Sequence, residues 1–248
     1  MSLESPIYDK EVIETLPPEI KEEYLQYAKM AWNSISEMTY NDTGLPSDQL
    51  HHHLYDGIPT GEVSKIDKTS PTNIGFLLAS IGGAYSMGFI SEQETYERLG
   101  KTITTIIKMT EDPEIFIKTR EDKGLFVNSI QPSTGTILKQ WPNTEIKIKQ
   151  QISTVDMARL IAFSKMTGVQ FPEYSDSIET YLNKMDLPFM FNHSTGFFNG
   201  CYNINDKCFE PWQYDVLSEA RIAYLLCDDG ILHEMSKLIN RRTENSFF

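Results

Sequence analysis

Two acidic residues in the segment W-Q-Y-D-V-L-S-E-A-R-I-A-Y-L-L are the first candidates for chemistry. Asp215 and Glu219 are four residues apart, so in a helix over residues 212–227 their carboxylates would lie side by side. Ile222 and Leu226 continue that face as an apolar stripe. A carboxyl group desolvated at the end of such a stripe holds its proton more readily, and it can serve as a general acid.

The same pair also has a purely structural interpretation. Both acids would complement the positive N-terminal end of a helix dipole. Glu219 could in addition form an ion pair with a nearby arginine, without any role in chemistry.

Asp156, in the segment Q-I-S-T-V-D-M-A-R-L, is the second acidic candidate. In a helix over residues 152–167 it shares a stripe with Leu160 and Phe163, an apolar face on which an aspartate is unusual. The alternative is an aspartate in the first turn that accepts bonds from free backbone N–H groups beneath a Ser153 cap. The sequence leaves both interpretations open.

Other polar and aromatic residues are weaker candidates. The three histidines at 51–53 are adjacent and point in different directions, so they lack metal-site spacing, and we predict neither a metal nor a cofactor. No phosphate-binding glycine loop and no nucleophile-elbow motif is visible. Aromatic side chains are numerous enough to line a binding cleft, with core packing as the alternative for each: Trp32, Trp141, Trp212, Tyr55, Phe197, Phe198 and Tyr202.

The segment D-K-T-S-P-T-N-I-G-F-L-L-A-S-I-G-G-A-Y-S-M-G-F-I-S, residues 67–91, predicts two antiparallel helices with a short connection. Pro71 suits a first helical turn after a Thr-Ser cap. Gly88 suits the left-handed residue that ends a helix, and Ser91 with Glu94 forms a capping box for the next one. The pair Gly82-Gly83 inside the first helix suggests a close approach by another backbone.

The rest of the chain continues the alternation of helices with turns and loops. We expect a long irregular loop over 40–68 and strand-containing segments over 115–141 and 189–212. The expected helices cover residues 18–38, 71–87, 92–109, 152–167, 172–186, 212–227 and 231–241. This pattern predicts a mainly α fold with small β-hairpin excursions, and it suits an α/α toroid of antiparallel helical hairpins.

Four stretches resemble the glucoamylase-like, β-1,2-glucan-active group of bacterial proteins. That group includes β-1,2-glucanases, a segment of cyclic β-1,2-glucan synthases and a related domain of unknown function. The resembling stretches are S-P-T-N-I-G with G-F-I-S, N-D-T-G-L-P-S-D, the residues around Asp156, and Y-D-V-L-S-E-A-R-I-A around Asp215 and Glu219. The resemblance implies a glycoside hydrolase that acts on a β-glucan oligosaccharide or polysaccharide through paired carboxylates.

The resemblance also implies roles for single residues. Glu219 or Asp156 would be the acid, with Asp215 as its helper, and an opposing acid would face a cleft between helices 212–227 and 153–167, roofed by loop 40–68. Where the related domain has Trp-Asp-Ile-Gly, this chain has Asn73, which cannot transfer a proton and is expected to bind a sugar hydroxyl or to act as a structural amide. The other expected substrate-binding residues are Asp48, Asp56, Asp67, Tyr55, His53, Trp212, Phe198 and Arg221. The rival class is a non-catalytic glycan-binding or scaffolding domain, which needs no facing pair of carboxylates.

Composition bears on the class of binding partner and on the location of the protein. The 248 residues carry a formal net charge of −13, which argues against a nucleic-acid partner because phosphate binding needs a basic surface. No apolar run reaches the roughly 18 residues of a membrane span, and the N-terminus lacks a signal-peptide pattern. Extracellular, periplasmic and cytoplasmic locations in a bacterium all stay open.

Domain organisation is expected to be simple. Residues 1–14 read as an extended arm and residues 15–248 as one domain. A complete toroid of six hairpins needs more helices than this chain supplies, so we expect an abbreviated domain, a fragment, or self-association that completes it. Cys201 and Cys208 flank a polar loop and are expected as free thiols, with a small disulfide as the alternative, and Cys227 is expected in the core.

Overall fold

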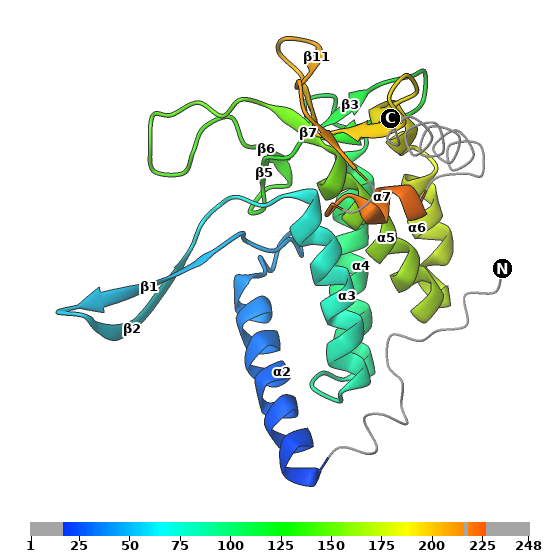
Figure 1. Cartoon of the computed structure of the whole chain (residues 1–248). Coiled ribbons are helices and arrows are strands. Elements are labelled where there is room, and N and C mark those ends of the chain that lie inside the picture. The colour runs from blue at the N-terminus through cyan, green and yellow to red at the C-terminus, as the bar shows by residue number, and fades with distance from the viewer. Residues whose placement is uncertain (1–16, 216–217, 227–248) are drawn as a thin grey trace, which may run out of the picture.

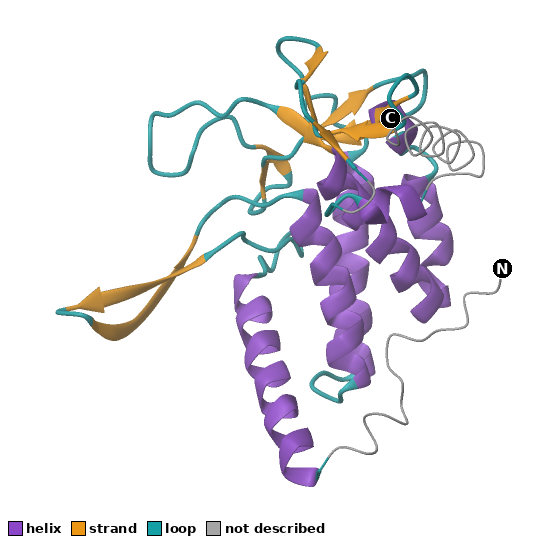
Figure 2. Cartoon of the chain, viewed as in Figure 1, coloured by secondary structure: helices purple, strands orange, loops and turns teal. Residues whose placement is uncertain are grey.

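The computed structural model describes residues 17–215 and 218–226 (Figure 1). Within these residues the helices lie side by side and the short strands gather at one end of them (Figure 2). The expected arm, the helix at 231–241 and Cys227 lie outside the described residues.

Apolar residues at helical spacing produce a mainly helical chain, as predicted. The α-helices are α2 (Pro18–Met38), α3 (Pro71–Ser86), α4 (Glu92–Met109), α5 (Thr154–Gln170), α6 (Ser175–Leu182) and the short α7 (Arg221–Leu225). Two 3-10 turns cover Pro172–Tyr174 and Leu187–Met190. No helix in the described ranges is long and apolar enough to cross a membrane.

Local signals between residues 67 and 94 set the hairpin of α3 and α4, and most of them are confirmed. Pro71 begins α3, although the Ser70 side chain makes no cap hydrogen bond. Gly88 adopts a φ of 72° and the connection to α4 is short. Ser91 Oγ accepts a bond from Glu94 N at 3.2 Å, while the Glu94 carboxylate pairs with Arg98 at 2.8 Å instead of closing the capping box.

The strands are short and form sheets of two or three members within the described residues, so the expectation of minor hairpins is confirmed. Between residues 115 and 141 the two-stranded pairs are β3 (Phe116–Lys118) with β4 (Gly124–Phe126), and β5 (Ile130–Gln131) with β6 (Thr136–Ile137). The three-stranded sheets join β7 (Gln151–Ser153), β10 (Cys201–Asn203) and β11 (Cys208–Phe209), and β8 (Phe191–Asn192), β9 (Phe197–Asn199) and β12 (Gln213–Tyr214).

The expectation of an irregular loop over 40–68 is wrong, because its middle is a β-hairpin. Strands β1 (Leu50–Tyr55) and β2 (Ile58–Lys65) pair antiparallel, with Tyr55 opposite Ile58. Asp56 and Gly57 between them have φ values of 51° and 77°, as a two-residue type I′ turn requires. The hairpin projects away from the helices (Figure 1).

The expected helix over 212–227 is also wrong. Residues Gln213 and Tyr214 form β12, which pairs with β9, and helical structure is described only from Arg221 to Leu225. The cause is a long-range partner that spacing does not reveal. The Trp212 ring occupies the place that a Cβ on Gly200 would need, and Gln213 Nε2 donates to Asn199 Oδ1 at 2.9 Å.

Two other helices differ from expectation at their ends. Ile152 lies in β7, so α5 begins at Thr154 and continues past Gly168 to Gln170. The segment expected as one helix over 172–186 is a 3-10 turn followed by α6, which ends at Leu182.

The core is built around a close parallel contact between α3 and α5. A Cβ on Gly75 would lie only 3.0 Å from Arg159 O and from Leu160 Cα, so this crossing needs glycine. Further along, Gln170 Nε2 donates to Gly82 O at 3.1 Å. The contacts advance together in sequence, so the two helices run in the same direction and begin at the same end of the molecule.

The close approach expected at Gly82-Gly83 is therefore only partly correct. Gly82 contacts the side chain of Gln170, whereas a Cβ on Gly83 would meet only Met87 Cε, at 3.9 Å. The backbone contact itself lies two turns earlier, at Gly75.

The connections are unequal at the two ends of the helices. Residues 87–91 and 171–174 make short turns at one end. The long connections 39–70, 110–153 and 183–215 leave from the end where α3 and α5 begin, and among the described residues they carry all the strands, with the β1–β2 hairpin projecting away from the helices (Figures 1 and 2). We call this the loop end of the molecule.

Candidate functional site

Asp156 lies in the first turn of α5, at the loop end. Ser153 caps the helix by accepting a bond from Asp156 N at 3.4 Å, the cap that belongs to the structural alternative for this aspartate. The Asp156 carboxylate is partly exposed. With the Asn128 amide oriented so that its nitrogen faces the carboxylate, it donates to Oδ2 at 2.9 Å and to Oδ1 at 3.3 Å. A neutral donor from the connection 110–153, which leads into α5, thus holds this acid.

Glu219 lies close to the same stretch of α5. Arg159 Nη2 is 3.3 Å from Glu219 Oε2, and the Tyr214 hydroxyl donates to Glu219 Oε1 at 3.1 Å. Burial and the hydrogen bond to Glu219 raise the pKa of Tyr214, and the charges of Glu219 and Asp156 add to this shift. Tyr214 therefore lies within electrostatic reach of both acids, so the structure brings Asp156 and Glu219 into one neighbourhood.

Asp48 and Asn73 meet at the start of α3. Asn73 Nδ2 donates to Asp48 Oδ1 at 2.6 Å, and Lys68 Nζ forms an ion pair with Asp48 Oδ2 at 2.8 Å. The Lys68 ammonium also lies 5.2 Å from the centre of the Trp141 ring. This group contains one acid, one base, one amide and one aromatic ring.

Asp67 fixes a neighbouring turn. Its Oδ1 accepts a bond from Ser133 N at 3.0 Å, and its Oδ2 accepts bonds from Ser133 Oγ at 2.6 Å and Gln131 Nε2 at 2.7 Å. Burial, then the charge of Asp67 and a hydrogen bond to it, raise the pKa of Tyr40. These contacts indicate that Asp67 holds the connections 39–70 and 110–153 together.

Asp215 is not placed as predicted. It follows β12 directly and is exposed, so it does not share a helical face with Glu219, and the side-by-side argument is wrong. Arg221 begins α7 and is exposed. Trp212 is 44% exposed and packs edge-to-face on Tyr214 at 5.0 Å.

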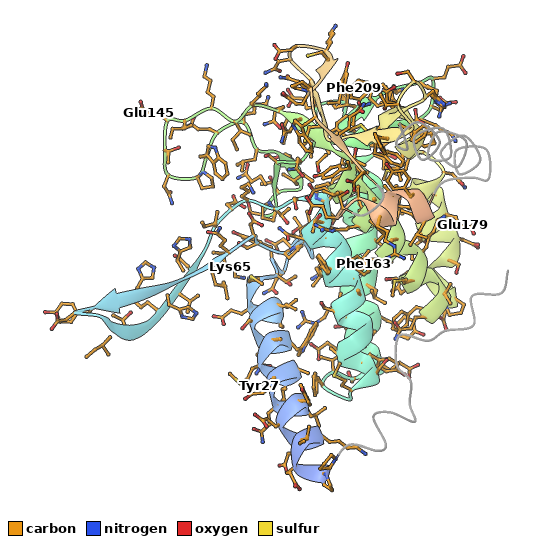
Figure 3. The ribbon with its side chains drawn as sticks, viewed as in Figure 1. Tyr27, Lys65, Glu145, Phe163, Glu179 and Phe209 are labelled. Atoms are coloured by element: carbon orange, nitrogen blue, oxygen red, sulfur yellow. The ribbon has the colours of Figure 1, made fainter. Side chains whose placement is uncertain are left out.

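Three expected binding residues lie on the projecting hairpin. His53 and Asp56 are exposed, and Tyr55 is 80% exposed at the tip. His53 Nε2 contacts Ser64 Oγ of the opposite strand at 3.1 Å. Figure 3 shows Lys65 near the base of the hairpin, with the side chains further out standing clear of the helices. The structure does not bring these residues to Asp156 or Asn73.

Phe198 belongs to the core. It is fully buried and packs on Phe191 and Tyr224, with ring centres 5.3 and 4.9 Å apart. The core interpretation, which the sequence left open, therefore applies to this residue, and its expected contact with substrate has no support in the structure.

Sequence reasoning missed the residues that contact the candidate acids: Lys68, Asn128, Gln131, Ser133, Arg159 and Tyr214. Arg159 lies one helical turn after Asp156, but its observed contact with Glu219 joins residues 60 positions apart, which helical spacing does not encode. Asn128 comes from the connection after β4 and carries no local signal for a contact with α5.

Several other features bear on the predicted chemistry. No group of three or more His, Cys, Asp or Glu side chains suited to a metal ion is found in the described part of the chain. Cys201 is buried and Cys208 exposed, both as free thiols. A pocket of about 410 Å³ lies between residues 39–44 and α4, lined in part by Glu94 and Arg98 and by no residue of α5 or α7.

Known proteins support the family resemblance. The family model described as "Protein of unknown function (DUF3131)" matches residues 26–195. The cyclic beta-(1,2)-glucan synthase NdvB of Rhizobium meliloti (strain 1021) is 35% identical over 89 residues, which are 36% of this chain and 3% of that protein.

Two solved structures share the fold. A glucoamylase-like protein from Bacteroides fragilis NCTC 9343 matches 83% of this chain and 43% of its own, with a TM-score of 0.50 and 14% identity. The endo-beta-1,2-glucanase from Chitinophaga pinensis, in complex with sophorotriose and glucose, matches 83% of this chain and 46% of its own, with a TM-score of 0.50 and 13% identity. The chain therefore spans less than half the length of these relatives.

Proposed function

This chain belongs to the DUF3131 family, described as proteins of unknown function, and we propose that it is a carbohydrate-active protein, a glycoside hydrolase that acts on a β-glucan. The resemblance to glucan-active proteins motivates the substrate class. The fold we propose is an α/α toroid, in which α3 and α5 are inner helices and α2, α4 and α6 are outer ones, over a single domain of residues 15–248. The parallel course of α3 and α5, each paired with an antiparallel neighbour, supports this arrangement.

The observation that carries the proposal is the placement of two separately held carboxylates at the loop end. Asp156 and Arg159 are one helical turn apart, where Cβ atoms are about 5–6 Å from each other, and Arg159 contacts Glu219. Glycosidases hold their two carboxyl groups about 5–5.5 Å apart when retaining and about 6.5–9.5 Å apart when inverting, and the proposal requires Asp156 and Glu219 to face the substrate at one of these separations.

The two acids have different partners. Glu219 forms an ion pair with Arg159 and accepts a bond from Tyr214, whereas Asp156 accepts bonds from the Asn128 amide. One of the two would act as the general acid that protonates the leaving oxygen, and the other as the base or nucleophile. Asp215 stays a candidate helper, now from the end of a strand instead of a helix face.

Hydrolysis of β-glucans by the purified chain tests the proposal. Reducing-end release from β-1,2-, β-1,3- and β-1,4-linked glucans is measured for wild type, Asp156→Asn and Glu219→Gln. We expect each variant to lose at least about 100-fold in kcat, the usual contribution of a positioned acid or base. The change in Tm should be small, because exposed ion pairs contribute about 1 kcal/mol or less. Glu179→Gln, an exposed acid on α6, is the control and should behave as wild type.

The second candidate function is glycan binding without catalysis. It is favoured by the ion pair between Glu219 and Arg159, which also has a purely structural explanation. Saturable binding of a glucan with no hydrolysis by wild type would support it. A large loss of stability in Glu219→Gln with hydrolysis intact would assign Glu219 a structural role and contradict the proposed mechanism.

A further inference from the structure

A half-exposed indole lies beside the start of α3, outside the pair of proposed catalytic acids. We propose that Trp141, together with Lys68 and Asp48, forms a subsite that binds one neutral hexopyranose ring of a glucan. The inference rests on the proposed carbohydrate substrate, and it adds a binding position to the proposed chemistry.

Trp141 is exposed, yet its backbone is fixed. Trp141 N donates to Ile146 O at 2.9 Å, and Trp141 O accepts bonds from Thr144 N at 3.2 Å and Thr144 Oγ1 at 3.1 Å. Asn143 in this turn has a φ of 59°, a conformation that asparagine tolerates well. A side chain on a closed turn loses less conformational freedom on binding than one on an open loop.

Lys68 covers part of the indole, and solvent reaches the rest. Lys68 Nζ lies 5.2 Å from the ring centre, while Trp141 is 42% exposed and stacks on no other aromatic ring among the described residues. Water against an apolar aromatic surface is unfavourable, and covering that surface releases this water. The C–H face of a pyranose ring could cover this surface, and the cation beneath fixes the orientation of the ring.

Polar groups for the sugar hydroxyls lie next to the indole. The Asp48 side chain is 30% exposed and receives one bond from Lys68 and one from Asn73. A carboxylate offers about four acceptor positions, so Asp48 can also accept hydroxyl donors from a ligand. An aromatic face beside a carboxylate and an ammonium group supplies both the stacking surface and the hydrogen bonds that a sugar needs.

The charges in and around the subsite favour a neutral sugar over an acidic one. Lys68 is paired with Asp48, so the subsite offers no unpaired cation, and the chain as a whole carries a formal charge of −13. An acidic sugar such as a glucuronate would enter a negative field. We therefore assign the subsite to a neutral ring. Asn73 and Asp156 lie in the first turns of two parallel helices, so this ring would bind beside the proposed reaction centre.

Binding is tested in the Asp156→Asn background, in which the proposed cleavage is removed. Sophorotriose, laminaritriose, cellotriose and a glucuronate trisaccharide are titrated while tryptophan emission and calorimetric heat are followed. Trp141→Ala, the ring-preserving Trp141→Phe, and Tyr24→Ala as an exposed aromatic control on α2 are compared. We expect at least one neutral trisaccharide to shift the emission, with about tenfold weaker binding in Trp141→Ala, partial recovery in Trp141→Phe and no change in Tyr24→Ala.

The inference is overturned if Trp141→Ala binds the neutral trisaccharides as tightly as its parent, if none of them binds, or if the glucuronate binds best. Circular dichroism and Tm of each variant confirm that the fold is retained. Failure of the proposed function looks different: no glucan would be hydrolysed by wild type, while Trp141-dependent binding remained. Hydrolysis with an unchanged kcat/KM in Trp141→Ala would remove the subsite and leave the proposed function standing.

Discussion

The contact between α3 and α5 predicts opposite effects for two glycine-to-alanine changes in one helix. At Gly75 a Cβ would lie 3.0 Å from Arg159 O and Leu160 Cα. Both atoms belong to the backbone of α5 and cannot move without the helix. At Gly83 the nearest atom outside the helix backbone is Met87 Cε, at 3.9 Å, which is ordinary contact.

The magnitudes follow from packing and helix propensity. Overpacking at a closed contact destabilises by about 1–3 kcal/mol, and alanine in place of glycine in a helix stabilises by about 0.5–1 kcal/mol. Gly75→Ala should therefore lose about 1–2 kcal/mol of unfolding free energy, and Gly83→Ala should gain about 0.5–1 kcal/mol. For a chain of this size about 1 kcal/mol shifts Tm by about 2–4 °C, so the two variants should differ by about 3–12 °C.

Thermal unfolding followed by circular dichroism, together with urea titration at constant m-value, measures both effects. The urea midpoint separates a change in stability from a change in the denatured state. Gly75→Ala with a stability equal to or above that of Gly83→Ala would refute the parallel contact between α3 and α5, and with it the shared end that places Asp156 near Asn73.

Two further predictions concern buried groups. Burial would raise the pKa of Asp186, but hydrogen bonds from Arg120 and Thr119 outweigh it and hold that pKa below its usual value. This stabilisation is present above the unfolded pKa of about 4 and is lost as pH falls through the folded pKa. Asp186→Asn should therefore lower Tm by about 3–10 °C at pH 7 and by less near pH 2.5. An equal loss of Tm at both pH values would contradict the lowered pKa of Asp186. Burial raises the pKa of Cys201 to about 11, so iodoacetamide at pH 8 should label the exposed Cys208 first and Cys201 only after denaturation. Peptide mass spectrometry reads out both sites, and equal labelling of the native chain would refute the burial of Cys201.

Sequence reasoning succeeded where the signals were local. Pro71, Gly88 and Ser91 fix the ends of α3 and α4 by backbone chemistry that involves only their neighbours. Prediction of secondary structure failed where two local signals disagreed, or where pairing with a strand distant in sequence determined the structure. Asp56-Gly57 is a strong hairpin signal, but polar residues and Pro59 around it suggested a loop. The apolar spacing after Trp212 suggested a helix, although pairing of β12 with Asn199 and Phe198 determined a strand.

The candidate site divides in the same way. The first-turn position of Asp156 and its Ser153 cap follow from the local sequence, which offered them as the structural alternative for this acid. The side chains that contact these acids lie further away in the sequence. Lys68 contacts Asp48 from 20 residues away, and Asn128 contacts Asp156 from the connection that precedes α5. No helical or strand period encodes such pairs, so only the fold reveals them.

The parallel course of α3 and α5 also has a consequence for how the chain folds. Gly75 and Leu160 are about 85 residues apart in sequence, and closing so long a loop loses chain entropy that grows with the logarithm of its length. The hairpin of α3 and α4 closes over a few residues and can form first. The neighbourhood of Asp156 and Glu219 is therefore assembled only when distant parts of the chain meet, so native-state hydrogen exchange should find the first turn of α5 protected by global, not local, unfolding.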